Sequence, residues 1–244
     1  IMYDVIIVGL GPAGNMTALS IAENSGLDVL AVDRKKEIGV HVSCAGGISI
    51  NMLNKVGLEV PNSCIATKCY GVRFFSPSGI EFKIETKDEH DYILHRNRFD
   101  QWLAGKVMAA RVETRLNTNI TGLTKEGVKT KDGEIKGKIN VGAEGPISRI
   151  GKFAGIPLVK PFRKTVKDNI LLVGDAAGHI DPFGGGCIVH NKREEYEKLW
   201  KKELGKVFIR RHKIKQVLDK WTDKDLDRFF DVLKDFKLKS SDRA

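Results

Sequence analysis

The stretch that decides the fold of this chain is Val5-Ile6-Ile7-Val8-Gly9-Leu10-Gly11-Pro12-Ala13-Gly14. Its first four residues are β-branched, which is typical of a short strand that is buried on both faces. Residues 12–24 continue with a helical pattern, and residues 27–33 form the next apolar run. The stretch therefore predicts a βαβ unit of about thirty residues, with the glycines between the first strand and the helix.

The three glycines have separate roles in such a unit. Gly9 permits the tight turn after the strand, Gly11 lets a pyrophosphate approach the main chain, and Gly14 lets the helix pack closely on the strand. The helix N-terminus offers N–H groups and a partial positive charge to the phosphates. Asp33 follows Gly14 by nineteen residues, where a carboxylate accepts hydrogen bonds from ribose hydroxyls. The motif leaves two alternatives open, a glycine-rich turn without a ligand and a nicotinamide enzyme.

Two later glycine segments narrow these alternatives. They are Gly142-Ala143-Glu144-Gly145-Pro146 and Gly174-Asp175-Ala176-Ala177-Gly178. The second follows an apolar strand predicted over 170–174, so Asp175 is placed to hold the ribityl chain of a flavin. Residues 182–186 precede a helix that we expect at Ile188, whose N-terminus stabilises negative charge at the pyrimidine end of a reduced flavin. These segments favour FAD over a nicotinamide dinucleotide.

The remaining sequence predicts a mixed α/β chain. Pro77-Ser78-Gly79 separates the two strands of a hairpin expected over 71–76 and 80–85. Asn97 is expected to cap a helix over 98–110. The other expected elements are a loop over 35–47, a helix over 48–56, a second hairpin around 131–133, and strands over 92–95 and 139–142.

The chain after residue 190 is predicted to be helical. Thr222 and Asp225 fit a capping box at the start of the last helix. Apolar residues then repeat at three and four positions, and we interpret this stripe as core packing rather than as a binding surface. The stripe consists of Leu226, Phe229, Phe230 and Leu233.

Composition describes a globular chain with a basic tail. Charged residues make up 30% of the 244 residues and hydrophobic ones 41%, and the formal net charge is +10. From Asn191 onward 17 Lys and Arg outnumber 11 Asp and Glu, a net of +6. This excess indicates either a solvated helix face or an anionic partner, such as a lipid headgroup, a nucleotide or a nucleic acid. No nucleic-acid reading motif accompanies it, so we expect no nucleic-acid partner.

The apolar runs and the cysteines indicate the compartment. No run approaches the length of a membrane span, and no signal peptide is evident, so we expect a cytoplasmic protein. The cysteines form no CxxC pair and lack histidines at zinc-ligand spacing, which predicts reduced thiols and no metal site. They are Cys44, Cys64, Cys69 and Cys187.

With these motifs in place, the chain resembles the geranylgeranyl reductase family of FAD-dependent oxidoreductases, in particular the archaeal digeranylgeranylglycerophospholipid reductases. The glycine segments are shared with many flavoenzymes, including aromatic hydroxylases, whereas the Cys-Ala-Gly-Gly-Ile loop is more specific to the family. The resemblance is good over residues 2–157 and patchy afterwards. Beyond the glycine segments it rests on Ser43-Cys44-Ala45-Gly46-Gly47-Ile48-Ser49, Arg96-x-x-Phe99-Asp100 and Tyr196-Glu197-Lys198-Leu199-Trp200.

The resemblance implies a Rossmann-like α/β FAD-binding fold of the glutathione reductase or aromatic hydroxylase type. It implies an FAD-binding domain over 1–157 and 168–190 with hairpin insertions at about 64–96, a remnant of the substrate-domain insertion over 158–167, and a helical region over 191–244. With the motif glycines Gly9, Gly11 and Gly14, the residues implied to contact FAD are Ala13, Asp33, Cys44, Ala45, Gly47, Arg96, Ile120, Asp175, Gly185, Gly186, Cys187 and Ile188.

The implied activity is hydrogenation of isolated alkenes in the geranylgeranyl chains of membrane phospholipids. An unactivated alkene is a poor hydride acceptor, so proton delivery to one carbon must accompany hydride transfer to the other. A neutral thiol supplies or relays such a proton, and we hypothesise this catalytic role for Cys44. The alternative for Cys44 is a small buried hydrophobic residue, which is the usual environment of a free cysteine.

Two departures from the family affect the substrate region. Only 28 residues separate Gly145 from Gly174, where the family has much of its antiparallel sheet and a Tyr-x-Trp-x-Phe-Pro motif. A second contraction follows Ile188. Cys187 stands where the family has a glycine, and Glu144 stands where it has an aspartate. The Cys187 position belongs to the flavin-contacting loop of the family. Together these changes leave the FAD half largely intact and reduce the substrate half.

The sequence therefore predicts an FAD-dependent reductase of prenylated phospholipids, shortened in its substrate region. NADPH, a deazaflavin or ferredoxin is the expected electron donor, and peripheral contact with the anionic inner face of the membrane is expected of the tail. The alternatives are a flavin-dependent monooxygenase of the same architecture and a non-catalytic flavin-binding or electron-transfer protein that has lost its lipid pocket.

Overall fold

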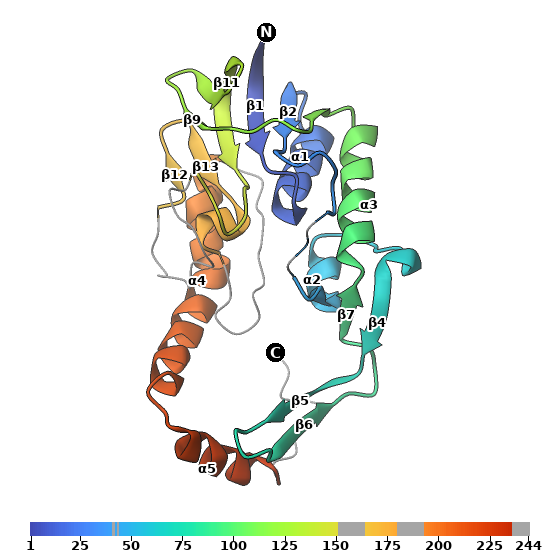
Figure 1. The fold of residues 1–244 in the computed structure, drawn as a ribbon, viewed down its shortest axis with the longest axis vertical. Helices are drawn as coiled ribbons and strands as arrows, with labels where there is room; N and C mark the ends of the chain where they lie inside the picture. Colours follow the sequence, from blue (N-terminus) through green and yellow to red (C-terminus); the bar gives the residue numbers. More distant parts are fainter. Residues whose placement is uncertain (41, 43, 151–163, 180–192, 236–244) are drawn as a thin grey trace. The chain divides into compact units, whose positions relative to one another are not determined.

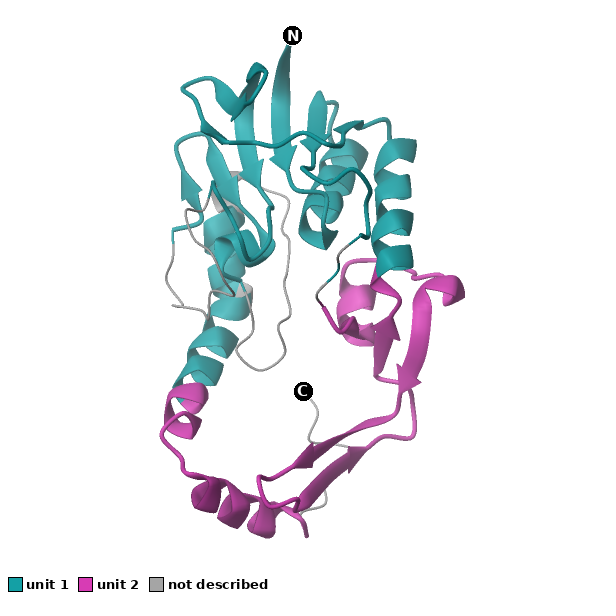
Figure 2. Cartoon of the chain, viewed as in Figure 1, with its two compact units in different colours: residues 1–42, 97–213 teal, residues 43–96, 214–244 magenta. Residues whose placement is uncertain are grey.

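The computed structural model describes residues 1–40, 42, 44–150, 164–179 and 193–235 (Figure 1). These residues divide into two compact units, coloured separately in Figure 2. Unit 1 comprises residues 1–42 and 97–213, and unit 2 comprises residues 43–96 and 214–244. The predicted domain boundaries after 157 and 190 lie outside the described residues, so the predicted domain division stays a prediction.

Unit 1 is built on a parallel sheet. Strand β1 (Met2–Val8) pairs in parallel with β2 (Val29–Val32) on one side and with β11 (Gly133–Gly142) on the other. The main path of the sheet is β12-β13-β11-β1-β2-β8, along which β12 pairs antiparallel with β13 and the other neighbours pair in parallel. Two more antiparallel strands belong to the same sheet: β10 (Gly127–Thr130) pairs with β11, and β9 (Gly122–Leu123) pairs with β10. The outer strands are β8 (Glu113–Arg115), β12 (Val166–Lys167) and β13 (Ile170–Leu172).

The β-branched run of β1 is buried on both faces of this sheet, as the sequence predicts. Val5 and Ile7 belong to one core cluster, and Ile6 and Val8 belong to the cluster on the opposite face. Each such side chain contributes about 1.5–3 kcal/mol when it is fully buried. The first cluster includes residues of three helices: α1 (Pro12–Asn24), α3 (Arg96–Ala109) and α4 (Arg193–Leu218). The second includes residues from β10 (Gly127–Thr130) and packs against β9 (Gly122–Leu123).

Unit 2 contains two small sheets. In the first, β3 (Gly47–Ser49) and β4 (Ile65–Cys69) flank β7 (Asp91–Leu94) in antiparallel order. The second is the predicted hairpin, formed by β5 (Gly71–Phe75) and β6 (Glu81–Glu85). The helices that lie wholly within this unit are α2 (Ile50–Lys55), the short 3-10 helix η1 (Asn62–Cys64) and α5 (Asp223–Leu233). Residues 214–218, at the end of α4, also belong to this unit.

The start of α5 confirms the predicted capping box. The main-chain N–H of Asp225 donates to Thr222 Oγ1 at 3.3 Å, and the N–H of Thr222 donates to Asp225 Oδ2 at 2.9 Å. Two residues after Asp225, the Asp227 carboxylate accepts hydrogen bonds from the N–H and the hydroxyl of Ser78, at 3.0 and 2.8 Å. These bonds attach α5 to the turn of the hairpin.

The interpretation of the α5 stripe as core packing is wrong for the described residues. No residue of α5 is buried, and Phe229 keeps 41% of its surface exposed. The reason lies in what the helix packs on. A two-stranded hairpin offers too small an apolar surface to cover the whole stripe, so only part of it is shielded.

Two predicted helix starts are also wrong. Ile48 was expected in a helix, but it pairs with Tyr92 in the β3–β7 ladder, and α2 begins at Ile50. Asn97 was expected to cap a helix, but α3 already begins at Arg96, so Asn97 lies inside its first turn. In the first case a tertiary strand pairing overrides the local helical pattern.

Candidate functional site

The three glycines of the first motif occupy three different environments. Gly9 has a φ of +106°, and a Cβ there would lie 2.4 Å from the carbonyl oxygen of Ala143. A Cβ on Gly14 would lie 1.7 Å from the carbonyl oxygen of Gly9. At Gly11, by contrast, no atom of the described residues comes within 4 Å of a Cβ position. Gly9 and Gly14 are therefore required by packing, whereas Gly11 faces open space.

Asp33 lies directly beside this loop. It is 9% exposed and follows β2, and its Oδ2 accepts a hydrogen bond of 2.8 Å from the main-chain N–H of Leu10. Its Oδ1 accepts a second bond of 2.8 Å from the N–H of Lys35. A carboxylate has about four acceptor positions, so Asp33 holds the loop and keeps acceptor capacity for ribose hydroxyls.

The predicted FAD contact Ile120 lies in the segment that follows β8. The N–H of Thr118 in this segment donates to the carbonyl of Asp33 at 2.9 Å. Ile120 itself is 3% exposed and belongs to the second core cluster. The structure therefore brings Ile120 and Asp33 into one region of unit 1, with the Ile120 side chain in the core.

The two later glycine segments reach the same edge of the sheet. Gly142 ends β11, and the N–H of Ala143 donates to the carbonyl of Val8 at 2.8 Å. The neighbouring strand β13 leads into the 3-10 helix η2 (Gly174–Ala177), which carries Asp175. Since β1, β11 and β13 are parallel neighbours, all three glycine segments follow their carboxyl ends. The strand order reverses between β1 and β11, which is where such sheets bind dinucleotides.

A second group of predicted residues comes together in unit 2. Gly46 has a φ of +84°, and a Cβ there would lie 2.5 Å from the carbonyl oxygen of Leu94 and 3.4 Å from Cγ of Arg96. The N–H of Gly46 donates to Cys44 Sγ at 3.4 Å. Gly47 then enters the ladder opposite Ile93. The loop from Cys44 through Ala45 to Gly47 is thus held against the end of β7, next to Arg96.

The exposure of Cys44 tests one of its two interpretations, that of a small buried hydrophobic residue. Cys44 is exposed, so its interpretation as a small buried hydrophobic residue is wrong. The sulfur accepts a hydrogen bond from Gly46, which leaves the S–H group to donate elsewhere. Four other predicted contacts, Gly185, Gly186, Cys187 and Ile188, lie outside the described residues.

Two features of the site were not predicted from the sequence to be functional, and the first is the carboxylate of Glu144. The Glu144 carboxylate accepts hydrogen bonds from the Ser148 hydroxyl at 2.6 Å and from the N–H of Ile150 at 2.9 Å. It therefore closes the turn that follows β11, with Gly145 at a φ of +76°. An acid four residues before a serine was the available signal, because short polar side chains and acids commonly close such turns.

The second missed feature is a buried aromatic cluster beside η2. The ring centroids of His179 and Trp200 lie 4.4 Å apart, and the Tyr196 hydroxyl lies 3.3 Å from His179 Nδ1. Trp200 Nε1 donates to Thr165 Oγ1 at 3.1 Å. All three rings are at most 2% exposed. The spacing of Tyr196 and Trp200 by four residues was the signal, since it places both on one helix face.

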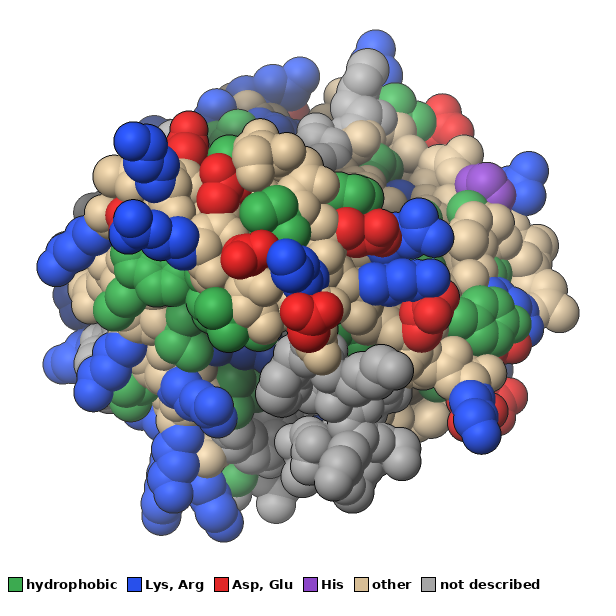
Figure 3. All heavy atoms as spheres, turned by 90° about the horizontal axis from the view of Figure 1, so that it is seen from below, with side chains coloured by type: hydrophobic (Ala, Val, Ile, Leu, Met, Phe, Trp, Pro, Cys, Tyr) green, Lys and Arg blue, Asp and Glu red, His purple; other side chains and the backbone are tan. Residues whose placement is uncertain are grey.

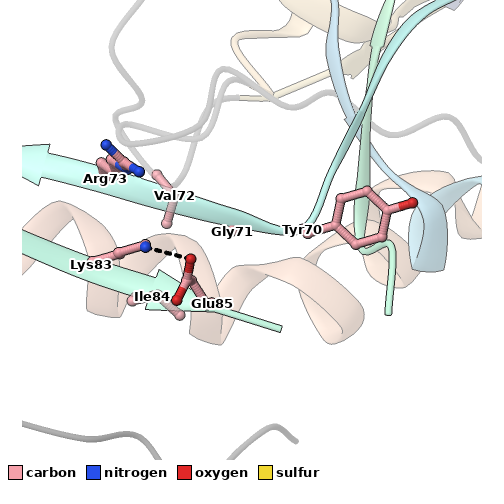
Figure 4. Close-up of a pocket in the computed structure, with 7 residues that line it drawn as sticks. All are labelled: Tyr70, Gly71, Val72, Arg73, Lys83, Ile84 and Glu85. Carbon is pink, nitrogen blue, oxygen red and sulfur yellow. Dashed lines mark ion pairs between the residues drawn. The ribbon is translucent and has the colours of Figure 1, made fainter. Parts of the chain in front are cut away.

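The structure also contains a hollow of about 180 Å³ on the β5–β6 hairpin. Figure 4 shows its lining, in which Lys83 and Glu85 form an ion pair beside Val72 and Ile84. None of the predicted cofactor residues lines it. A shallow surface formed by one hairpin does not enclose a dinucleotide, so this hollow is not the candidate site.

The sheet order, the glycine cradle and Asp33 define a dinucleotide-binding α/β protein of the flavoprotein type. The sequence model of the family described as FAD binding domain matches residues 2–167. The chain belongs to this family. The residues present fit its cofactor, because the open space at Gly11 and the helix N-terminus at Pro12 suit a pyrophosphate, and Asp33 suits a ribose.

Two curated relatives and one solved structure extend this finding. Digeranylgeranylglycerophospholipid reductase of Methanosarcina acetivorans is 36% identical over 194 residues, covering 74% of this chain and 46% of that protein. Digeranylgeranylglycerophospholipid reductase 2 of Methanopyrus kandleri is 37% identical over 185 residues, covering 70% and 45%. The chain thus spans about half the length of these relatives.

A crystal structure of a geranylgeranyl bacteriochlorophyll reductase-like protein from Thermoplasma acidophilum has a TM-score of 0.89 and 20% identity. The match covers 98% of this chain and 93% of that one. At this identity the match shows the fold alone, and that fold agrees with the predicted FAD-binding architecture.

Proposed function

We propose that this protein is an FAD-dependent reductase that hydrogenates carbon–carbon double bonds in the geranylgeranyl chains of membrane phospholipids. The observation that carries the proposal is the 36–37% identity to proteins named digeranylgeranylglycerophospholipid reductase. The FAD binding domain model matches residues 2–167, which include the glycine cradle, and this match supports FAD as the cofactor. NADPH, a deazaflavin or ferredoxin is the proposed electron donor.

The residues of unit 1 would bind and orient the cofactor. The main chain at Gly11 and the N-terminus of α1 would hold the pyrophosphate, Asp33 the ribose, and Asp175 the ribityl chain. When bound and reduced, FAD supplies the hydride for the reaction. The Cys44 thiol would deliver the proton that the other alkene carbon takes up, because its sulfur accepts a hydrogen bond from the N–H of Gly46 and the residue is exposed.

The test uses the purified protein and a geranylgeranyl phospholipid under anaerobic conditions. We expect a flavin absorbance spectrum, and reoxidation of the reduced protein that depends on the lipid and yields a saturated bond. A colourless protein that cannot be reconstituted with FAD contradicts the proposal. For Cys44, the Cys44→Ala variant should bind FAD and lose alkene reduction, whereas the Cys69→Ala variant should keep it. Full turnover by Cys44→Ala would show that this thiol is not the proton donor.

A flavin-binding or electron-transfer protein is the second candidate function. Only 28 residues lie between Gly145 and Gly174, and an interval of this length is too short to form a large lipid-binding sheet. The short interval favours a protein that binds FAD without binding the lipid. Such a protein would bind FAD and exchange electrons with a small donor without reducing the lipid. The same anaerobic experiment separates the two candidates.

We also propose that α4 contacts an anionic phospholipid surface. Residues 206–218 contain five Lys and Arg and no Asp or Glu. Three apolar side chains of this segment are also exposed: Val207 at 42%, Ile214 at 42% and Val217 at 53%. Figure 3 shows one face of the molecule, on which Lys and Arg side chains border hydrophobic ones. A helix with basic and exposed apolar side chains suits binding at a membrane interface. Among the described residues, no helix combines the length and the hydropathy that a membrane span requires.

Sedimentation with vesicles tests the contact. Vesicles rich in phosphatidylglycerol should retain the protein at low salt, and phosphatidylcholine vesicles should not. Ile214→Ser should weaken retention, while Met108→Ser, which changes a similarly exposed apolar residue on α3, should leave it unchanged. Equal retention on both kinds of vesicle would contradict the proposal.

A further inference from the structure

Both polar main-chain atoms of Leu10 are held by buried side chains. The N–H of Leu10 donates to Asp33 Oδ2 at 2.8 Å. The carbonyl oxygen of Leu10 accepts a hydrogen bond of 2.7 Å from Nδ2 of Asn15. Leu10 is 2% exposed and Asn15 is fully buried. The residue between Gly9 and Gly11 is therefore held from both sides, and it cannot rotate without breaking one of these bonds.

The bond from Asn15 also sets the direction of the next N–H group. The carbonyl of Leu10 and the N–H of Gly11 belong to one planar trans peptide, so they point in opposite directions. Because Asn15 holds the carbonyl toward the buried side of the loop, the N–H of Gly11 points away from Asn15. Of the three glycines of the motif, Gly11 is the one whose Cβ position has no described atom within 4 Å. The amide orientation thus favours an acceptor on the open side of the loop.

The side-chain amide of Asn15 donates this bond through Nδ2, but its oxygen stays without a partner among the described residues. This oxygen, Oδ1, is buried. A buried amide with one half unsatisfied is unfavourable for folding. Such departures from full satisfaction are expected where main-chain geometry serves a site. Folding stability alone therefore does not account for an asparagine at this position.

We propose that Asn15 is a positioning residue for the cofactor phosphates. It does not touch the cofactor, but it orients the Leu10–Gly11 peptide so that the Gly11 N–H is presented to a pyrophosphate oxygen before binding. Asp33 holds the preceding peptide in the same way. The inference rests on FAD as the ligand of this cradle, and it adds a residue that lies outside the glycine motif.

The experiment compares Asn15→Leu with Thr17→Val. The control changes a residue on the same helix that is 4% exposed, and it removes one hydrogen bond of 2.8 Å, from the Thr17 hydroxyl to the Ala13 carbonyl. Both variants lose a hydrogen bond donated by a side chain of α1, but only the first releases Leu10. Asn15→Ser, which keeps a shorter donor, serves as a milder variant in case Asn15→Leu does not fold.

Two measurements are made on each variant. The first is hydrogen exchange of the apoprotein at the amides of residues 9–14, and the second is the dissociation constant for FAD. We expect Asn15→Leu to accelerate exchange in this segment and to raise the dissociation constant by tenfold or more, with Asn15→Ser between it and the wild type. Thr17→Val should change neither, even where its melting temperature falls as far.

The outcomes separate the inference from the proposed function. An Asn15→Leu protein that binds FAD as the wild type does, with unchanged exchange at residues 9–14, overturns the positioning role. So does an equal loss of affinity in Thr17→Val, because that result indicates a general effect of destabilising α1. A wild-type protein that binds no FAD overturns the proposed cofactor and the phosphate role together, while the exchange measurement still decides whether Asn15 holds the loop.

Discussion

Two alanine substitutions in the first glycine motif should affect different properties of the protein. Gly14→Ala should lower the stability of the fold, whereas Gly11→Ala should weaken the binding of FAD. A Cβ on Gly14 would lie 1.7 Å from the Gly9 carbonyl oxygen, whereas contacts under 3.0 Å are essentially never seen. Helix α1 would have to move away from the loop by more than 1 Å. Because the obstructing atom belongs to the main chain, a change of side-chain rotamer cannot relieve the contact.

The magnitude follows from the cost of overpacking. Forcing an extra carbon into a tight core costs about 1–3 kcal/mol, and a main-chain obstruction at this distance belongs at the upper end. A loss of about 3 kcal/mol lowers the melting temperature of a protein of this size by roughly 6–12 °C. Gly11→Ala should change the free energy of unfolding by less than about 1 kcal/mol, because Gly11 has a φ of −74° that alanine adopts easily.

Thermal unfolding of the apoproteins and titration with FAD measure the two effects. Gly14→Ala should melt early. Gly11→Ala should melt near the wild type but bind FAD at least about tenfold more weakly, because its methyl group enters the space that the pyrophosphate needs. A wild-type melting temperature for Gly14→Ala would refute the packing argument. Wild-type affinity in Gly11→Ala would show that the open space is not the phosphate site.

Three further predictions concern the loop of unit 2, the aromatic cluster and α5. Gly46→Ala should destabilise the protein by about 2–3 kcal/mol in urea unfolding, because φ is positive and main chain obstructs the Cβ, whereas Gly47→Ala should stay within about 1 kcal/mol. Trp200→Ala should cost about 3–5 kcal/mol in the same assay, since the ring is 2% exposed. The hydrogen bonds from Thr222 lower the pKa of Asp225. At any pH above the ordinary aspartate pKa of 3.8, the Asp225 carboxylate is ionised and stabilises α5. This stabilisation is lost as the pH falls through the lower pKa that Asp225 has in the folded protein. Hydrogen exchange of α5 against pH should show this loss, and Asp225→Asn should abolish it.

The first βαβ unit could be predicted from the sequence because its determinants are local. A β-branched run, a glycine turn and a helix starting at Pro12 follow one another within the first 24 residues, and α1 spans Pro12–Asn24 as expected. The roles of Gly9 and Gly14 as packing glycines also follow from this order, because the turn and the helix–strand approach occur within the same short segment.

Short strands and buried polar bonds could not be predicted in this way. Strand β8, with three residues, and β3, which contains Ile48, form because they find partners far along the chain. The carboxylate of Glu144 and the amide of Asn15 acquire their roles from the turns they contact. Local pattern does not encode those contacts, since propensity for strand or helix is weak when tertiary pairing competes with it.

The sequence by itself determined that three glycine segments, an acid nineteen residues after the first of them and a βαβ pattern belong to a dinucleotide-binding protein, because these signals depend on main-chain geometry over a few residues. Tertiary structure alone decided that the segments meet at the carboxyl ends of β1, β11 and β13, and that Asp33 and Asn15 hold Leu10 between them. It also decided that the apolar stripe of α5 remains partly exposed. Strand order and side-chain burial depend on partners distant in the chain, so only the folded sheet could determine them.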